Sequence, residues 1–111
     1  MNKVAVLKTT NYGECDVCIG KYPYAPDEIA VILTNCGEHI STLSICSVDF
    51  LMPKTLEKGE FIAKTYSENE QIAKDAMESG LFEETGKFVQ TGWVQSPIWK
   101  FVDVEVLNES Y

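Results

Sequence analysis

Four residues between positions 15 and 39 have the types and the spacing of metal ligands. Cys15 and Cys18 form a C-x-x-C pair, and after 17 further residues Cys36 and His39 form a C-x-x-H pair. Thiolate and imidazole are ligands that zinc prefers, and four protein ligands complete a structural site with no open position. The spacing therefore predicts a structural zinc ion bound by Cys15, Cys18, Cys36 and His39.

Features of the neighbouring sequence favour a zinc site over unrelated reduced thiols and a surface histidine. His39 is the only histidine in the chain, and it stands at the spacing that completes the ligand set. A glycine accompanies each pair, Gly20 after the first and Gly37 inside the second, where a metal knuckle bends sharply. Cys46 is interpreted as a small buried hydrophobic residue, and it is the reserve fourth ligand if His39 points away.

Strand patterns surround these ligands. Residues 4–8 alternate weakly as a first strand, and residues 22–26, with two prolines, predict a loop that either packs over the metal or contacts a partner. The apolar run 28–34 and the run 40–46 flank a short glycine-containing segment. This pattern is typical of a hairpin, and its turn would be the second pair of metal ligands.

The clearest helical pattern runs over residues 68–79. Ser67 and Glu70 predict a capping box at its start, and Gly80 predicts its end. The residues at helical spacing on the inner face are apolar: Ile72, Ala73, Ala76 and Met77.

An acidic block coincides with this helix. Between positions 68 and 84 the sequence has six acidic residues and one lysine. Such a face is either simply solvated or a surface for a partner. For the second case the predicted contacts are Glu68, Asp75 and Glu78.

Further strands are predicted over residues 61–66, 86–95 and 98–107, the last two separated by Ser96-Pro97. Residues 50–52 are expected to plug the core, and Trp93, Trp99 and Phe101 to pack in it. Together the patterns predict a single α+β domain over residues 1–111. It would have an antiparallel sheet, one main helix packed on it, and a zinc-ribbon-like knuckle pair at one end. Zinc-binding hairpins would occupy 13–46, and the helix and C-terminal strands 60–107.

The charge of the chain restricts its partners. There are 17 acidic residues against nine lysines and no arginine, which gives a formal net charge of −8. Proteins that hold nucleic acid neutralise its phosphates with lysine and arginine, so direct nucleic-acid binding is not expected. The acidity either keeps a cytosolic protein soluble or suits a basic protein partner.

Enzyme activity is not expected either. A catalytic zinc keeps one coordination position open, whereas four protein ligands fill the predicted site. If the single histidine is a ligand, no Ser-His or Cys-His pair can form, and no phosphate-binding glycine loop is present. A redox role remains open if Cys18 or Cys46 is free and has a low pKa.

The start of the chain has no apolar signal segment, and no run approaches the length that spans a membrane. Its cysteine usage fits a reducing compartment. We therefore expect a cytoplasmic protein with no membrane partner.

Three stretches carry a resemblance to small uncharacterised proteins from phages and mobile elements of Gram-positive bacteria. The resemblance extends from about residue 30 to residue 101, and it is carried by residues 36–45, 67–70 and 85–101. The last stretch is the most specific, with its Thr-Gly, Gly-aromatic and Pro-x-aromatic-x-Phe steps. That family usually has proline where His39 stands and lacks the paired cysteines, so it does not imply the zinc site.

A small, acidic member of this kind with a zinc site also resembles the type II-A anti-CRISPR proteins. The resemblance implies an inhibitor that binds the type II RNA-guided nuclease of the host and prevents target DNA from loading. The alternative is a non-enzymatic, zinc-stapled interaction module of a mobile element with another host partner. Both readings assign the zinc a structural role.

Overall fold

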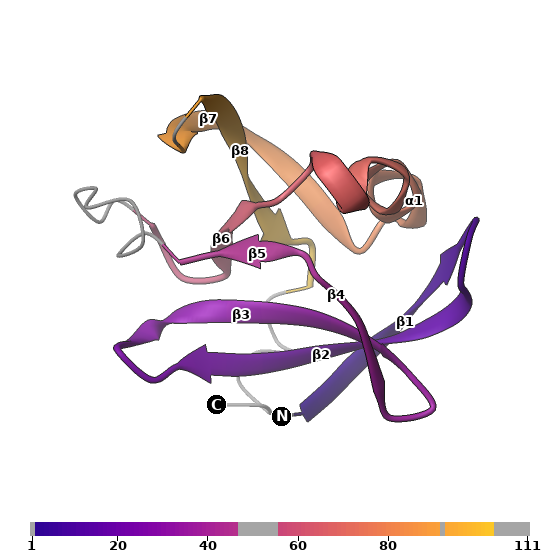
Figure 1. The fold of residues 1–111 in the computed structure, drawn as a ribbon. Helices are drawn as coiled ribbons and strands as arrows, with labels where there is room; N and C mark the ends of the chain where they lie inside the picture. Colours follow the sequence, from indigo (N-terminus) through magenta and orange to yellow (C-terminus); the bar gives the residue numbers. More distant parts are fainter. Residues whose placement is uncertain (1, 47–55, 92, 104–111) are drawn as a thin grey trace.

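The computed structural model of the protein describes residues 2–46, 56–91 and 93–103. Within these residues, eight strands form two four-stranded antiparallel sheets, and one α-helix lies beside them (Figure 1). The predicted α+β class is therefore confirmed. The strands form two sheets, whereas the sequence predicted one. The predicted plug at 50–52 and the end of the predicted last strand, 104–107, lie outside the described residues.

The first sheet is a meander of four strands in chain order. These are β1 (Asn2–Thr9), β2 (Gly13–Tyr22), β3 (Ala25–Asn35) and β4 (Glu38–Thr42). Along β2, Cys15, Val17 and Ile19 are buried while the residues between them are partly exposed. This period of two is that of a strand with one covered face. The hairpin predicted around Cys36 and Gly37 is confirmed, since β3 pairs with β4 there.

The second sheet has the order β5-β6-β8-β7. Its strands are β5 (Ser44–Ile45), β6 (Glu60–Ala63), β7 (Phe82–Thr91) and β8 (Val94–Phe101). The strand break expected at Ser96-Pro97 is wrong, because both residues lie inside β8. Strand β6 pairs only with Ile98, Trp99 and Lys100 of β8, so Pro97 lies beyond that ladder and its missing N–H is tolerated.

The chain passes from one sheet to the other at Leu43. Its backbone N–H donates to the Val31 carbonyl of β3, and its own carbonyl accepts from the Lys64 N–H, both at 2.8 Å. Ser44 completes the crossing, because its hydroxyl accepts the Val31 N–H at 2.9 Å and lies 2.8 Å from the Tyr22 hydroxyl. The predicted strand over 40–46 is thus two short strands in different sheets.

The two sheets share one hydrophobic core. Aromatic rings of the second sheet, from Phe61, Phe82, Trp99 and Phe101, have centroids 4.9 to 6.3 Å apart. They belong to the same buried cluster as Leu7, Val17 and Leu33 of the first sheet. The burial of Trp99 and Phe101 confirms their predicted core positions.

The predicted burial of Trp93 is wrong. Its side chain is fully exposed, at 101% of its reference area. Trp93 lies in the turn between β7 and β8, whose strands end at Thr91 and begin again at Val94. A residue at the tip of a hairpin has no neighbouring strand to cover it.

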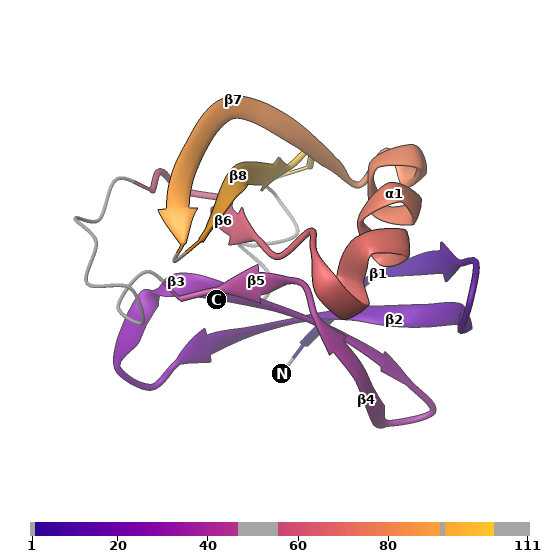
Figure 2. The same ribbon diagram turned by 45° about the horizontal axis from the view of Figure 1, so that its top comes forward.

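The helix α1 (Glu70–Ser79) follows a short 3-10 turn, η2 (Ser67–Asn69), and packs against β1 and β7 at one end of the sheets (Figure 2). The apolar face is confirmed by the burial of Ile72, Ala73 and Ala76. The predicted end is confirmed too, since Gly80 adopts the left-handed conformation with φ +79°. No helix in the described part of the chain is long and apolar enough to cross a membrane.

The predicted capping box is wrong. The intervening 3-10 turn moves the start of α1 to Glu70 and makes Asn69 the N-cap, without a side-chain capping bond. Ser67 has φ +58° and is the first residue of this turn, two positions before the N-cap, so it cannot serve as the N-cap of α1.

Asn69 joins the entry of the helix to the first sheet. Its side chain is completely buried, and its Oδ1 accepts a hydrogen bond from the Ser41 hydroxyl. Its Nδ2 donates to the carbonyl oxygens of Thr42 at 2.9 Å and Lys64 at 3.0 Å. One amide therefore joins the start of the helix to polar groups of two other segments, β4 and the chain just after β6.

Replacement of this amide should destabilise the protein strongly. Asn69→Ala removes the hydrogen bonds to two partly buried carbonyls and to the buried Ser41 hydroxyl, so we expect the free energy of unfolding to fall by about 3 kcal/mol. Urea denaturation followed by circular dichroism measures the change. Asn11→Ala, at an exposed position in the β1–β2 turn, is the matched control and should change stability by less than about 0.5 kcal/mol. Equal losses in the two variants would contradict the role given to Asn69.

Candidate functional site

The first pair of predicted zinc ligands lies inside a regular strand. Cys15 and Cys18 are three residues apart in β2, so their side chains leave opposite faces of the sheet. Cys15 is buried in the core, with its Sγ 4.0 Å from Thr9 Oγ1. Cys18 is partly exposed, with its Sγ 3.8 Å from Thr34 Oγ1.

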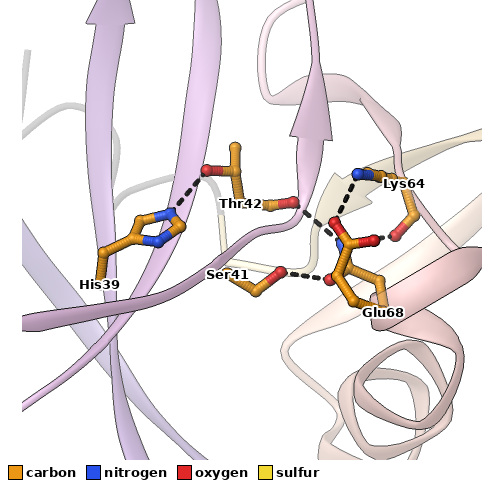
Figure 3. Close-up of polar contacts among 6 residues, drawn as sticks. His39, Ser41, Thr42, Lys64 and Glu68 are labelled. Atoms are coloured by element: carbon orange, nitrogen blue, oxygen red, sulfur yellow. Dashed lines mark hydrogen bonds and ion pairs between the residues drawn. The ribbon is translucent and has the colours of Figure 1, made fainter.

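The second pair lies at the β3–β4 hairpin turn, at the same end of the first sheet as the start of β2. Cys36 is exposed in the β3–β4 turn with φ +51°, and His39 is exposed on β4. The His39 ring points toward Thr42, and Nε2 lies 3.0 Å from Thr42 Oγ1 (Figure 3). Cys46, the reserve ligand, is buried, which confirms its interpretation as a small core residue.

The structure does not confirm the zinc-ribbon-like knuckle pair. Nowhere in residues 2–46, 56–91 and 93–103, which include every predicted ligand, do three His, Cys, Asp or Glu side chains come together as a metal-binding group. The physical reason is that β2 pairs with β1 on one side and with β3 on the other, which keeps residues 15–18 extended. Gly20 also lies within this strand, opposite Ala30, rather than at a bend.

His39 and Glu68, two of the predicted site residues, line one polar pocket. This pocket of about 460 Å³ opens where β4 and β5 meet the segment after β6. Lys64 Nζ and Glu68 Oε1 are 2.6 Å apart (Figure 3), and the hydrogen bond from Lys64 lowers the pKa of Glu68 to about 2. Burial raises the pKa of Tyr22, which also lines this pocket, to about 12. At neutral pH the carboxylate is thus charged and already paired, and the phenol is protonated.

The chemistry available in this pocket is limited. The His39 imidazole and the Thr42 hydroxyl are close enough to exchange a proton, but a histidine that acts as a base is normally oriented by a third group. Within the described residues no carboxylate contacts His39. The arrangement favours a hydrogen bond that orders β4 over a catalytic pair.

A second concavity lies between α1 and the β7–β8 hairpin, and we call it the helix groove. Its volume is about 530 Å³. Its apolar lining comes from Ala73, Met77, Phe88, Pro97 and Trp99, and its charged lining from Glu70, Lys74, Glu78 and Glu84. Phe88 is 54% exposed, which is unusual for so large an apolar side chain.

The three acidic residues predicted to contact a partner have different surroundings. Glu68 is paired with Lys64, as described above. Asp75 binds the β1–β2 turn, since its carboxylate accepts the Thr10 N–H at 2.8 Å and the Thr10 hydroxyl at 2.9 Å. Glu78 is exposed, lines the helix groove, and has no ion pair with any described residue. Of the three, Glu78 alone is both exposed and unengaged.

Sequence reasoning missed Glu70, Glu84 and Phe88 as members of this site. The two glutamates belong to the acidic block that the sequence showed, but the pattern alone did not reveal which carboxylates share a groove. The predicted strand over residues 86–95 includes Phe88, and its exposure follows from its place on β7, at the edge of the second sheet.

The contact between Asp75 and Thr10 predicts a pH-dependent contribution to stability. Burial by itself would raise the pKa of Asp75, but the hydrogen bonds from the Thr10 N–H and hydroxyl and from Gln71 outweigh it and hold the pKa below its ordinary 3.8. A lowered pKa in the folded state stabilises the fold above pH 3.8, and this stabilisation is lost as the pH falls through the folded-state value.

Asp75→Asn should therefore lower the free energy of unfolding by about 1 kcal/mol at neutral pH. The difference from the parent protein should shrink when urea denaturation is repeated at about pH 3. Glu78→Gln, on the same helix and without a described ion pair, serves as the control and should show little change at either pH. A deficit for Asp75→Asn that is independent of pH would rule out the charge of Asp75 as its source.

Comparison of the chain with protein-family models, with curated proteins and with solved structures finds no match in any of the three. The resemblance to mobile-element proteins and to anti-CRISPR proteins stays a prediction from the sequence. The function therefore has to be inferred from the helix groove, the polar pocket and the charge of the chain.

Proposed function

We propose that this protein is a non-enzymatic inhibitor that acts by docking its acidic helix groove on a basic surface of another protein. The observation that supports this most is the pairing of unneutralised carboxylates with an exposed aromatic ring. Glu70, Glu78 and Glu84 surround a groove that contains Phe88. Apolar area supplies affinity at a protein interface, and complementary charge supplies specificity and speed of association.

The charge of the whole chain supports a basic protein partner rather than nucleic acid. With a net charge of −8 and no arginine, the chain repels phosphates, but it is attracted to proteins that bind them. Such proteins present grooves rich in lysine and arginine. An acidic domain bound in such a groove competes with the nucleic acid.

The sequence resemblance identifies the first partner to test, the type II RNA-guided CRISPR nuclease. In this proposal the protein is an anti-CRISPR inhibitor that prevents target DNA from loading. The second candidate is an interaction module of a mobile element whose groove binds another basic host protein. Both candidates use the same groove, so they differ in partner and not in surface.

The residues proposed for the contact differ in part from those predicted from the sequence. Glu78 is retained. Glu68 is paired with Lys64, and Asp75 accepts a hydrogen bond from Thr10. A partner could bind either carboxylate only by breaking these internal contacts, which would cost binding free energy. Glu70 and Glu84 replace them in the proposal.

A cleavage assay with the guide-loaded type II nuclease tests the partner. We expect cleavage of target DNA to stop when excess protein is added before the DNA, and to persist when the DNA is bound first. This order dependence is expected because the proposed inhibitor and the DNA compete for one basic surface. A restriction endonuclease with the same DNA is the control for non-specific effects of an acidic protein. Full cleavage in both orders would remove the anti-CRISPR candidate.

Zinc remains a prediction from the spacing of Cys15, Cys18, Cys36 and His39, and the metal content of the purified protein tests it. The prediction is about one zinc per chain, released in Cys15→Ser. His39→Ala and Cys46→Ser distinguish the two candidates for the fourth ligand, since only replacement of the true ligand weakens binding. Zinc-free protein after growth in zinc-supplemented medium would end this prediction.

A further inference from the structure

We propose that the helix groove binds a basic amphipathic segment, a short stretch of a partner protein that presents an apolar side chain flanked by lysines or arginines. This inference rests on the proposed function in taking the helix groove to dock on a basic protein. It adds the chemistry of the segment that fits the groove.

The floor of the groove is apolar and is built on secondary structure. Ala73 and Met77 come from α1, Phe88 from β7, and Pro97 and Trp99 from β8. Side chains held on a helix and two paired strands keep their positions better than side chains on loops. The half-exposed ring of Phe88 offers a surface for an apolar side chain, or a face over which a cationic group can lie.

The charged groups of the groove come from both of its sides. Glu70 and Glu78 lie on α1, with Lys74 between them, and Glu84 lies on β7. Three carboxylates and one ammonium group leave the groove with an excess of negative charge. A segment that carries lysines or arginines on both sides of an apolar residue complements this distribution.

These carboxylates are not neutralised within the described residues. Other acidic residues of the same sheet have partners: Glu60 binds Lys87 at 2.8 Å, and Glu83 binds Lys100 at 3.2 Å. By contrast, Glu70, Glu78 and Glu84 have no described cation within 4.0 Å. A cation from another molecule can therefore reach them without breaking an internal ion pair.

Trp99 supplies an independent observation at the same place. Its side chain is 2% exposed, and its indole Nε1 is the one buried side-chain nitrogen or oxygen that lacks a hydrogen-bond partner in the described part of the chain. A buried N–H without an acceptor is unfavourable. A backbone carbonyl of a bound segment would satisfy it if the indole tips toward the groove on binding.

The same features disfavour other occupants. Phosphates of nucleic acid and the anionic headgroups of a membrane would be repelled by three carboxylates. A second copy of this chain would bring a net charge of −8 to an acidic groove. The polar pocket beside His39 offers no comparable surface, because the charge of its lysine is already neutralised by Glu68.

Tryptophan fluorescence reports on the groove directly. The chain has two tryptophans, so Trp93→Phe, at an exposed turn, leaves Trp99 as the only tryptophan, which is excited at a wavelength that tyrosine does not absorb. The probe is a synthetic peptide of lysine and leucine at helical spacing, and its control has serine in place of every leucine. We expect the first peptide to change the Trp99 emission saturably and the second to bind about tenfold more weakly. Binding of both should weaken with added salt.

Two double charge variants then test whether the peptide binds in the helix groove. Glu78→Gln/Glu84→Gln should weaken binding of the lysine-leucine peptide about five- to tenfold. The matched variant Glu14→Gln/Glu38→Gln removes two exposed charges from the first sheet and should change it less than about twofold. Phe88→Ala should weaken the lysine-leucine peptide but not the lysine-serine peptide.

Several results would overturn this inference. If both double charge variants weakened binding of the lysine-leucine peptide equally, the peptide would be attracted only to the net charge of the protein and not to the groove. A Trp99 emission that changes with protein concentration in the absence of peptide would show a second copy in the groove. An emission that neither peptide changes would show that the groove binds no such segment.

The two proposals can fail separately. Uninhibited nuclease together with groove-dependent peptide binding would remove the nuclease as partner and keep the docking site. Inhibition of the nuclease that is unchanged in Glu78→Gln/Glu84→Gln would keep the nuclease as partner and remove the helix groove as the docking site.

Discussion

The crossing of the chain between the two sheets at Leu43 fixes most of this structure. Its N–H bonds to β3 of the first sheet, its carbonyl bonds to the chain just after β6, and its side chain is fully buried in the shared core. Each sheet has one apolar face, and each needs the other to cover it. The crossing sets how the two faces meet. Asn69 then hydrogen-bonds the start of the helix to Thr42, just before the crossing. The crossing therefore also fixes the position of α1 and of the groove beside it.

Local patterns predicted the elements well and their assembly poorly. The hairpin at Gly37, the apolar face of α1 and the helix end at Gly80 follow from spacing within a few residues, so the sequence was sufficient. The division of residues 40–46 between two sheets leaves no trace in the pattern, because a strand that changes sheets keeps its alternation. Trp93 was misplaced for a related reason: its hydrophobicity predicts burial, but its position in a turn leaves nothing to cover it.

The metal ligands show two patterns competing for the same residues. Cys15 and Cys18 have the spacing of a knuckle, but Cys15, Val17 and Ile19 also have the alternation of a half-buried strand. A C-x-x-C pair aims both thiols at one ion only where the chain bends, and pairing on both sides keeps residues 15–18 of β2 extended. The groove residues could not be predicted at all as a group. Glu70, Phe88 and Trp99 come from three elements, and only the packing of the helix against the second sheet brings them together.

Some acidic residues of the chain have hydrogen-bond partners within the protein, and others have none among the described residues. This difference bears on function more than the total number of acidic residues does. Glu60, Glu68 and Asp75 each accept hydrogen bonds from a lysine or a backbone N–H, so their charges stabilise the fold. Glu70, Glu78 and Glu84 have no such described partner, and their mutual repulsion is slightly unfavourable. Solubility alone could be served by carboxylates anywhere on the surface. Their location around an apolar groove with an exposed phenylalanine is what a basic, partly apolar partner requires.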